Sequence, residues 1–378
     1  MTTFFVTGAT GAMAPFLVHH FLHQDTGHRF LCLARRADAP ERLRRRIEAI
    51  CPACAPRVAP PAVRFVDGDM TRPIQADGRV DAAWHFAADL RMVPDAAPAI
   101  YATNLEGTRN ILDFCVRNRA ALYYLSTAYV CGTRTGLVRE DELLCGQGFR
   151  NAYEASKAHA ELLVQEWLVR HPGIVFRPSI VLGDTRTGTA LAFQGLYKLV
   201  WALWFLRERL GARTGKAGAA LADLMLRIPI VLPCISAEAG INVVGVEYVT
   251  ALLADLHRRP EAVGRTFHLA NPSPPTARVL LDLISGLVGV RGMRLVETGA
   301  LHLAEMLAEL PESIRRLVSK LWDQVKVYCP YFLGDHPVFD MSNVALVAGA
   351  IPPHPPIDEA TLRRLCSLAI ARRFRAIE

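Results

Sequence analysis

The chain has 378 residues, of which 51% are hydrophobic, so it can bury a substantial core, and its length predicts a second region beside a main domain. Its 43 basic and 36 acidic side chains leave a net charge of +7, which suits phosphate groups or an acidic protein partner. Nucleic acid is not an expected partner, because the basic residues are spread along the chain without a recognisable binding motif.

The first residues predict a strand, a glycine turn and a helix, in that order. Residues 3–6 form a short apolar run, and a helical pattern begins near Ala14. Gly8 would allow a tight turn, and Gly11 would let the backbone approach a pyrophosphate at the helix N-terminus. An ordinary glycine-rich turn is the alternative. We expect a dinucleotide site that includes Thr7, Gly8, Thr10, Gly11, Ala12 and Met13.

The second predicted strand, Arg29–Ala34, bears on which dinucleotide binds. It ends in Arg35-Arg36, and two adjacent arginines favour the 2′-phosphate of NADP over the ribose hydroxyl that Asp38 would bind in NAD. The arginines of the following helical pattern could add to a phosphate site or form a solvated face. Of these, we assign Arg45 to the site.

Two further strands are predicted before the middle of the chain. Val63–Val66 leads to Asp69 and Met70, which are placed to meet the adenine. Residues 82–88 form the next strand, and its small residues leave room for the cofactor. We assign Phe86, Ala87 and Ala88 to that contact.

Tyr153 and Lys157 stand four residues apart in a helix-forming run, so both side chains project to one face. An ammonium group beside a phenol favours the phenolate, so we expect Lys157 to lower the pKa of Tyr153 from its usual value of about 10. Such a pair supplies the proton transfer that carbonyl reduction or alcohol oxidation requires.

Together these residues resemble the extended short-chain dehydrogenase/reductases, over residues 3–275. The motifs that carry the resemblance are Gly8/Gly11, Asp69, 85–88, 104–108 and Tyr153/Lys157. Residues 31–35, 125–130 and 176–188 narrow it to the branch of fatty acyl-CoA reductases and thioester reductase domains. Gly245 and Val246 depart from that branch, which usually has Val or Ile and then Asp. The resemblance implies an α/β fold, a Rossmann-type doubly wound parallel sheet with a smaller, mostly helical C-terminal substrate region.

The resemblance also implies roles for individual residues. Thr127 would be the hydroxyl partner, with Tyr153 as acid and Lys157 as cation; Ser126 is a weaker candidate for the hydroxyl. Two donors on one carbonyl oxygen would stabilise the oxyanion that forms as hydride arrives. A threonine that merely bonds to backbone is the alternative. The implied NADPH site continues through Asn104, Ser126, Tyr153, Lys157, Arg177, Pro178, Ser179 and Ile180.

The expected NADP-binding domain comprises residues 1–188 and 240–270, and the expected substrate region comprises 189–239 and 271–378. Within the latter, Ala190–Leu210 has a helical pattern with large aromatic residues, which either wall an acyl channel or pack on the core. Charged residues interrupt this run, so a transmembrane span is not expected. Peripheral membrane contact through this face or Leu224–Leu232 stays open.

The remainder of the C-terminal region predicts mainly helices. Helical patterns cover 278–287, 300–310, 314–327 and a basic last segment, 358–375. These helices would complete the substrate region.

No metal site is expected from the cysteines and histidines. Cys51 and Cys54 form a C-x-x-C without a second pair, and His19, His20 and His23 look like exposed helix residues without acidic or cysteine partners. Nine cysteines without regular spacing indicate a reducing compartment. A first strand at residue 3 leaves no room for a signal peptide, so we expect a cytoplasmic protein.

Three functions fit the sequence. The first is NADPH-dependent reduction of an acyl thioester, held by an acyl-carrier protein or CoA, to an aldehyde and then an alcohol; Arg35-Arg36 and 179–187 favour it. The second is conversion of a free ketone, aldehyde or alcohol, with a sugar-nucleotide epimerase or dehydratase as a more distant variant. The third is a non-catalytic NADP-sensing regulator, which would not need Thr127, Tyr153 and Lys157 together.

Overall fold

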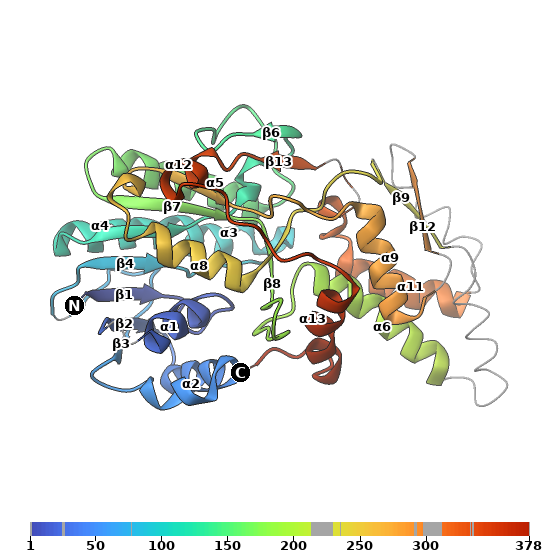
Figure 1. The fold of residues 1–378 in the computed structure, drawn as a ribbon, viewed down its shortest axis with the longest axis horizontal. Coiled ribbons are helices and arrows are strands. Elements are labelled where there is room, and N and C mark those ends of the chain that lie inside the picture. Colours follow the sequence, from blue (N-terminus) through green and yellow to red (C-terminus); the bar gives the residue numbers. More distant parts are fainter. Residues whose placement is uncertain are drawn as a thin grey trace.

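A seven-stranded parallel sheet organises the chain (Figure 1). The computed structural model describes residues 2–24, 27–76, 78–212, 230–234, 236–290, 293–297, 312–332, 334 and 336–377. In spatial order the strands are β3 (Val63–Asp67), β2 (Arg29–Ala34), β1 (Thr3–Thr7), β4 (Ala82–His85), β5 (Ala121–Leu125), β7 (Gly173–Pro178) and β11 (Thr266–Leu269). The order reverses between β1 and β4, which is where sheets of this type bind ligands. The predicted fold class is confirmed.

Helices cover both faces of the sheet. Successive strand residues point to opposite faces, so neighbouring residues of one strand are buried against different helices. Phe4 packs with helices α1 (Ala14–His23), α2 (Ala39–Ile50) and α8 (Val246–Leu256). Phe5 packs on the other side, with α4 (Gly107–Asn118) and α5 (Ala152–Leu168). The strands are apolar along their length, without alternation, because helices cover both faces of the sheet.

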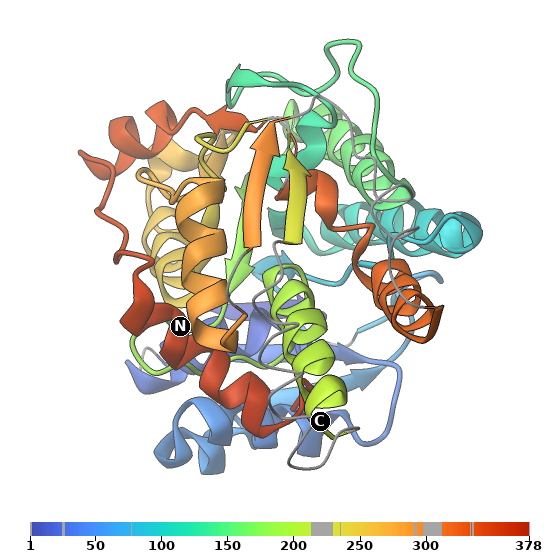
Figure 2. The same cartoon turned by 90° about the vertical axis from the view of Figure 1, so that its right-hand side faces the viewer.

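A second group of elements gathers beyond one end of the sheet (Figures 1 and 2). It contains α6 (Leu196–Ala212), α9 (Ala277–Val288), α11 (Glu312–Val325), α13 (Glu359–Ala371) and the paired strands β9 (Ile230–Cys234) and β12 (Met293–Glu297). The helices pack on one another, α6 against α9, α11 and α13. A further parallel pair, β8 (Ile180–Leu182) and β10 (Val243–Gly245), lies where the chain leaves the sheet for this group.

Shorter elements complete the described chain. They are α3 (Ala97–Tyr101), the 3-10 turns η1 (Pro52–Arg57), η2 (Pro94–Ala96), η4 (Ala128–Cys131), η5 (Pro260–Ala262) and η6 (Cys329–Tyr331), and the π-helical turn η3 (Ala102–Glu106). Strand β13 (Pro337–Phe339) pairs with β6 (Gly136–Val138), and α12 (Ser342–Ala348) packs on α8 and β11. This part of the expected substrate region therefore lies against the sheet domain.

Several predicted boundaries were wrong, each for a local reason. The helix expected from Ala190 begins only at Leu196, because Gly195 has φ +56, in the left-handed region that interrupts a helix. The strand expected over 82–88 ends at His85. The last helix ends at Ala371, before two residues with positive φ, Arg373 and Phe374.

Two sequence predictions fall wholly or partly outside the described residues. They are the helix over 300–310 and the first part of the apolar segment Leu224–Leu232. Among the helices that the structure describes, none combines the length and the apolar character needed to cross a membrane.

Candidate active site

One cavity of about 520 Å³ opens at the carboxyl ends of the strands. It extends from the glycine turn after β1, past the end of β2, to α5 and the segment around η6. The predicted residues that line it are Thr7, Gly8, Thr10, Gly11, Ala12, Met13, Arg35, Arg36, Met70, Phe86, Ala87, Ala88, Ser126, Thr127, Tyr153, Lys157, Pro178, Ser179 and Ile180. The fold thus brings together most of the residues singled out in the sequence.

The glycine turn has the shape of a cradle because side chains are missing from it. Gly8 has φ +69, and a Cβ there would lie 2.7 Å from the backbone nitrogen of Ala87. The N–H of Gly11 donates to the carbonyl of Gly8 at 2.8 Å, and a Cβ on Gly11 would meet that same oxygen. Pro15 lies in the first turn of α1, which begins at Ala14 directly after this cradle. The free N–H groups at the N-terminus of α1 suit a phosphate.

Arginines occupy the end of the cavity next to β2. Arg35, Arg36 and Arg42 line it. Arg36 donates to both carboxylate oxygens of Asp38, at 2.9 and 3.0 Å. Asp38, the residue that would favour NAD, is therefore already engaged by a cation.

The proposed catalytic side chains meet at the other end. Helix α5 starts at Ala152 because the Asn151 side chain accepts from the N–H of Glu154 at 3.0 Å. This start places Tyr153 and Lys157 in the first two turns, where both line the cavity. Thr127 follows β5 and also faces it.

Lys157 is held between α5 and β5. Its Nζ donates to the Tyr124 hydroxyl and to the Leu125 carbonyl, both at 2.8 Å, and lies 4.1 Å from the centre of the Tyr124 ring. Burial lowers the pKa of Lys157 to about 7, against an opposing effect of the Glu161 carboxylate. The ammonium position is thus set by backbone and ring contacts.

The expected lowering of the Tyr153 pKa was wrong. Burial raises the pKa of Tyr153 to about 12, because the phenolate would lose its hydration, and the nearby Glu154 carboxylate adds to this. A hydrogen bond with the Thr127 side chain acts in the opposite direction. The hydroxyl of Thr127 therefore offsets part of the effect of burial on the pKa of Tyr153.

Two serine hydroxyls of the cavity are buried without a hydrogen-bond partner among the described residues. They are Ser126 Oγ, after β5, and Ser179 Oγ, after β7. A buried hydroxyl without a partner costs free energy, so these groups fit a bound polar molecule. With the glycine cradle and the arginines, they match the donors that a nicotinamide dinucleotide needs.

Four predicted cofactor residues do not line the cavity. Arg45 is paired with Glu41 on the outside of α2, and Asp69 caps its own turn through Thr71. The other two are buried, each with protein partners.

Arg177 and Asn104 are the two predicted cofactor residues that are buried away from the cavity. The Arg177 guanidinium is fully buried and donates to Glu161 at 2.6 Å, so its charge is used inside the protein. The Asn104 amide donates to Ser156 Oγ at 2.9 Å and to the Asp89 carbonyl at 3.0 Å. Their placement gives both residues a structural role.

The sequence did not indicate that the segment around η6 reaches the site. Tyr328, Tyr331 and Phe332 line the cavity, and Tyr331 lies beside the start of α5. The Tyr331 hydroxyl donates to Glu154 and accepts from the Asn151 side chain at 2.8 Å. The one feature of the sequence that could have indicated this contact is the group of aromatic residues around Cys329-Pro330.

The aromatic helix α6 packs on the core rather than walling the cavity. Val200 is fully buried, and Trp204 packs against the ring of Phe374. From the predicted segment, the residues that line the cavity all precede the helix: Ala190, Leu191, Ala192, Gln194 and Gly195. Of the two predicted roles for this pattern, packing is the one that the described side chains show.

The parallel sheet, the glycine cradle and the Tyr–Lys helix at one cavity define an oxidoreductase of the extended short-chain dehydrogenase/reductase type. The model of the male sterility protein family matches residues 6–208, more than half of the sequence. The chain belongs to that family. The resemblance to its thioester reductase branch is thereby confirmed.

Known proteins of two kinds are similar to this chain. Aldehyde reductase lnaA of Aspergillus flavus is 26% identical over 306 residues, 74% of this chain and 26% of that protein. The non-canonical nonribosomal peptide synthetase FrzA of Cladobotryum sp is 25% identical over 303 residues, 74% of this chain and 27% of the other. The chain thus spans about a quarter of the length of these curated relatives.

Among solved structures, the terminal R domain from the myxalamid PKS-NRPS biosynthetic pathway superimposes with a TM-score of 0.77. It is 26% identical, and the match covers 99% of this chain and 92% of that one. A thiolation-reductase di-domain from an archaeal non-ribosomal peptide synthetase, 17% identical, shares the fold with a TM-score of 0.69, over 99% and 91% of the two chains.

Proposed function

We propose that the protein is an NADPH-dependent reductase that converts an acyl thioester into an aldehyde. The observation that carries this proposal is that Thr127, Tyr153 and Lys157 face the same cavity as the glycine cradle. The similarity to reductase domains of peptide synthetases supports a thioester substrate. An acyl-carrier protein or CoA would present the thioester, and a second reduction would give an alcohol.

The cofactor would lie along the cavity between its two ends. The glycine cradle would hold the pyrophosphate, and Arg35, Arg36 and Arg42 would bind the 2′-phosphate that distinguishes NADPH from NADH. Ser126 and Ser179 would supply hydroxyls to its polar groups near the reacting centre. When bound there, NADPH supplies the hydride.

The protein's own side chains would handle charge and proton at the substrate oxygen. Tyr153 and Thr127 would donate hydrogen bonds to the thioester carbonyl, and Tyr153 would give its proton to the oxyanion. Lys157, fixed by Tyr124 and Leu125, would offset the negative charge that forms on Tyr153. The reduced tetrahedral carbon would then release the thiol and leave the aldehyde.

Reduction of a free aldehyde is the second candidate, favoured by the similarity to a protein named aldehyde reductase. It would use the same three side chains. The two candidates differ in the group that leaves, since only a thioester releases a thiol. We also propose a cytoplasmic location.

The test measures NADPH consumption and thiol release together, with an acyl-CoA, an acyl-carrier thioester or a free aldehyde as substrate. Thioester-dependent loss of nicotinamide absorbance with one thiol released per aldehyde formed is the expected result. Turnover with aldehydes alone would favour the second candidate.

Tyr153→Phe should reduce the rate at least about a hundredfold, because it removes the proton donor, and should leave cofactor binding unchanged. Tyr101→Phe is the matched control, since Tyr101 bonds to His159 and does not line the cavity. Turnover by Tyr153→Phe equal to that of the control would show that another group supplies the proton.

A further inference from the structure

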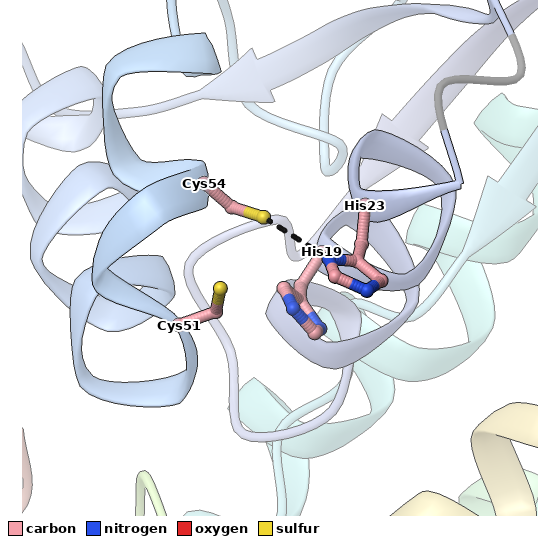
Figure 3. A group of neighbouring side chains, drawn as sticks. All are labelled: His19, His23, Cys51 and Cys54. Atoms are coloured by element: carbon pink, nitrogen blue, oxygen red, sulfur yellow. Dashed lines mark hydrogen bonds between the residues drawn. The ribbon is translucent and has the colours of Figure 1, made fainter.

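Two histidines and two cysteines form a cluster on the sheet face covered by α1 and α2, away from the cavity (Figure 3). One ligand atom from each of His19, His23, Cys51 and Cys54 lies within 4.8 Å of the other three. The Sγ of Cys54 is 3.8 Å from Nδ1 of His23. The expectation that these histidines have no cysteine partners was therefore wrong.

Local structure brings each pair together. His19 and His23 are four residues apart in the last turns of α1, so their rings lie on one face, with centroids 5.6 Å apart. Cys51 ends α2 and caps η1, and the N–H of Cys54 donates to its carbonyl at 3.0 Å. That tight turn directs both sulfurs towards α1 (Figure 3).

We propose that this cluster is a zinc site with two thiolate and two imidazole ligands. Zinc prefers a tetrahedron of such donors, with H-x3-H and C-x2-C within the usual ligand spacings. Bonds of about 2.3 Å to sulfur and 2.0 Å to nitrogen put the donors roughly 3.3 to 3.8 Å apart. The donors now lie within 4.8 Å of one another, so each pair needs to close by about 1.5 Å at most. Side-chain rotation alone can supply that movement.

The donor set also argues against other metal groups. A two-iron cluster with this composition would hold the cysteines on one iron and the histidines on the other, whereas here the sulfur and nitrogen donors all lie within 4.8 Å of one another. A zinc ion with two thiolates and two neutral imidazoles carries no net charge. Cys54 is buried and Cys51 and His19 are half-buried, so a neutral complex suits this position.

Four protein ligands leave no open position, so the site would be structural. It would join the end of α1 to the connection between α2 and β3, where Arg57 already donates to the Leu22 carbonyl. Helix α1 begins at the glycine cradle, and the buried Arg46 of α2 donates to the Gly11 carbonyl at 2.9 Å. The metal would thereby clamp the two helices that support the cradle.

The test uses the full chain, purified under reducing conditions, freed of metal with a chelator and titrated with Co²⁺. One equivalent should give the strong visible absorption of tetrahedral cobalt and a thiolate-to-cobalt charge-transfer band, and one equivalent of Zn²⁺ should displace it. Elemental analysis of protein isolated without chelator should find zinc at one per chain.

Cys54→Ser and His23→Gln should each lower metal affinity at least tenfold, since each removes one of four ligands. His23 is exposed, so its substitution leaves the core intact if Cys54→Ser does not fold. Cys145→Ser and His20→Gln are matched controls that lie outside the cluster and should bind metal like the parent chain. Zinc should also raise the Tm of the parent more than that of His23→Gln at the same zinc concentration.

Three results would overturn the proposal. They are a weak octahedral cobalt spectrum without the thiolate band, equal affinity of His23→Gln and the parent, and iron or copper in place of zinc. A Cys51–Cys54 disulfide in freshly isolated protein, with no effect of zinc on Tm, would instead assign the cysteines to redox chemistry.

Discussion

Arg42 and Arg45 are neighbours on α2 with different surroundings. Arg42 lines the cavity, and its Nε is buried without a partner among the described residues. Arg45 pairs with Glu41 outside the cavity. The difference lies in their partners and not in their spacing, since residues three apart occupy neighbouring positions on one helix face. It gives a matched pair of variants for the proposed NADPH selectivity.

Arg42→Ala should lower kcat/KM for NADPH about tenfold to a hundredfold, the value of a lost hydrogen bond to a charged group, and should barely change that for NADH. Arg45→Ala should alter neither. Steady-state kinetics with both cofactors checks this. An equal loss with NADH would mean that Arg42 acts on the fold or on a part common to both cofactors.

Tyr153 and Lys157 show what burial does to a single residue. Burial moves both towards their neutral forms, raising the pKa of the phenol and lowering that of the ammonium. A lysine four residues from a tyrosine on the same helix face therefore does not by itself lower the pKa of the phenol. The hydroxyl of Thr127, from another element, supplies the opposing effect.

At the scale of elements, His85 joins β4 to β1 and α4. Its Nδ1 lies 2.7 Å from the Thr7 hydroxyl, and its Nε2 lies 3.1 Å from the Thr108 hydroxyl. The Thr7 oxygen also accepts from the N–H of Ala87, next to the glycine cradle. A neutral ring, with one donor and one acceptor nitrogen, can bond to both hydroxyls. This network supports the floor of the cavity.

Burial lowers the pKa of His85 from 6.5 to about 3. Between these values the unfolded chain binds a proton that the folded protein does not, so the stabilising contribution is present above pH 6.5 and is lost as the pH falls. From pH 6.5 to 4.5 we expect a loss of about 2 to 3 kcal/mol of unfolding free energy from this residue.

His85→Gln should therefore show a shallower fall in unfolding free energy over that range than the parent chain. Urea unfolding at several pH values measures it. The other histidines, among them the buried His268 and the half-buried His257, remain in both proteins and cancel in the difference. Parallel pH curves would show that His85 does not carry this effect.

At the scale of the whole molecule, the C-terminal segment reaches back to the helix that carries Tyr153. Tyr331 bonds to Glu154, 177 residues earlier in the chain, and its ring lines the cavity. Strand β13 and helix α12 then return to the sheet domain, where the N–H of Asn343 donates to Glu140 at 2.7 Å. The expected division into two domains stays a prediction, since this segment contacts both regions.

Tyr331→Phe should keep the ring and lose the bond to Glu154. We expect KM for the thioester to rise roughly tenfold and the Kd for NADPH to stay constant. The bond orders the cavity wall beside the start of α5, away from the end that Arg35 and Arg36 line. Tyr328→Phe, which loses only an exposed bond to Gln194, should change KM less. A changed Kd in Tyr331→Phe would contradict this assignment.

The sequence alone was enough to predict the strands, the glycine turn and the Tyr–Lys pair, because each of them has a pattern among residues close in the chain. Apolar runs predict strands, two glycines permit a turn, and a spacing of four sets a helix face. The family membership followed from the same local motifs in order.

Only the tertiary structure decided which distant groups meet. His23 and Cys54 are 31 residues apart in the chain, and Tyr331 is farther still from Glu154. Neither contact has a local signature, because helix packing and the return of the C-terminal segment create both. The pKa of Tyr153 was likewise decided by the tertiary structure, because burial depends on the folded chain and not on the spacing of Tyr153 and Lys157 in the sequence.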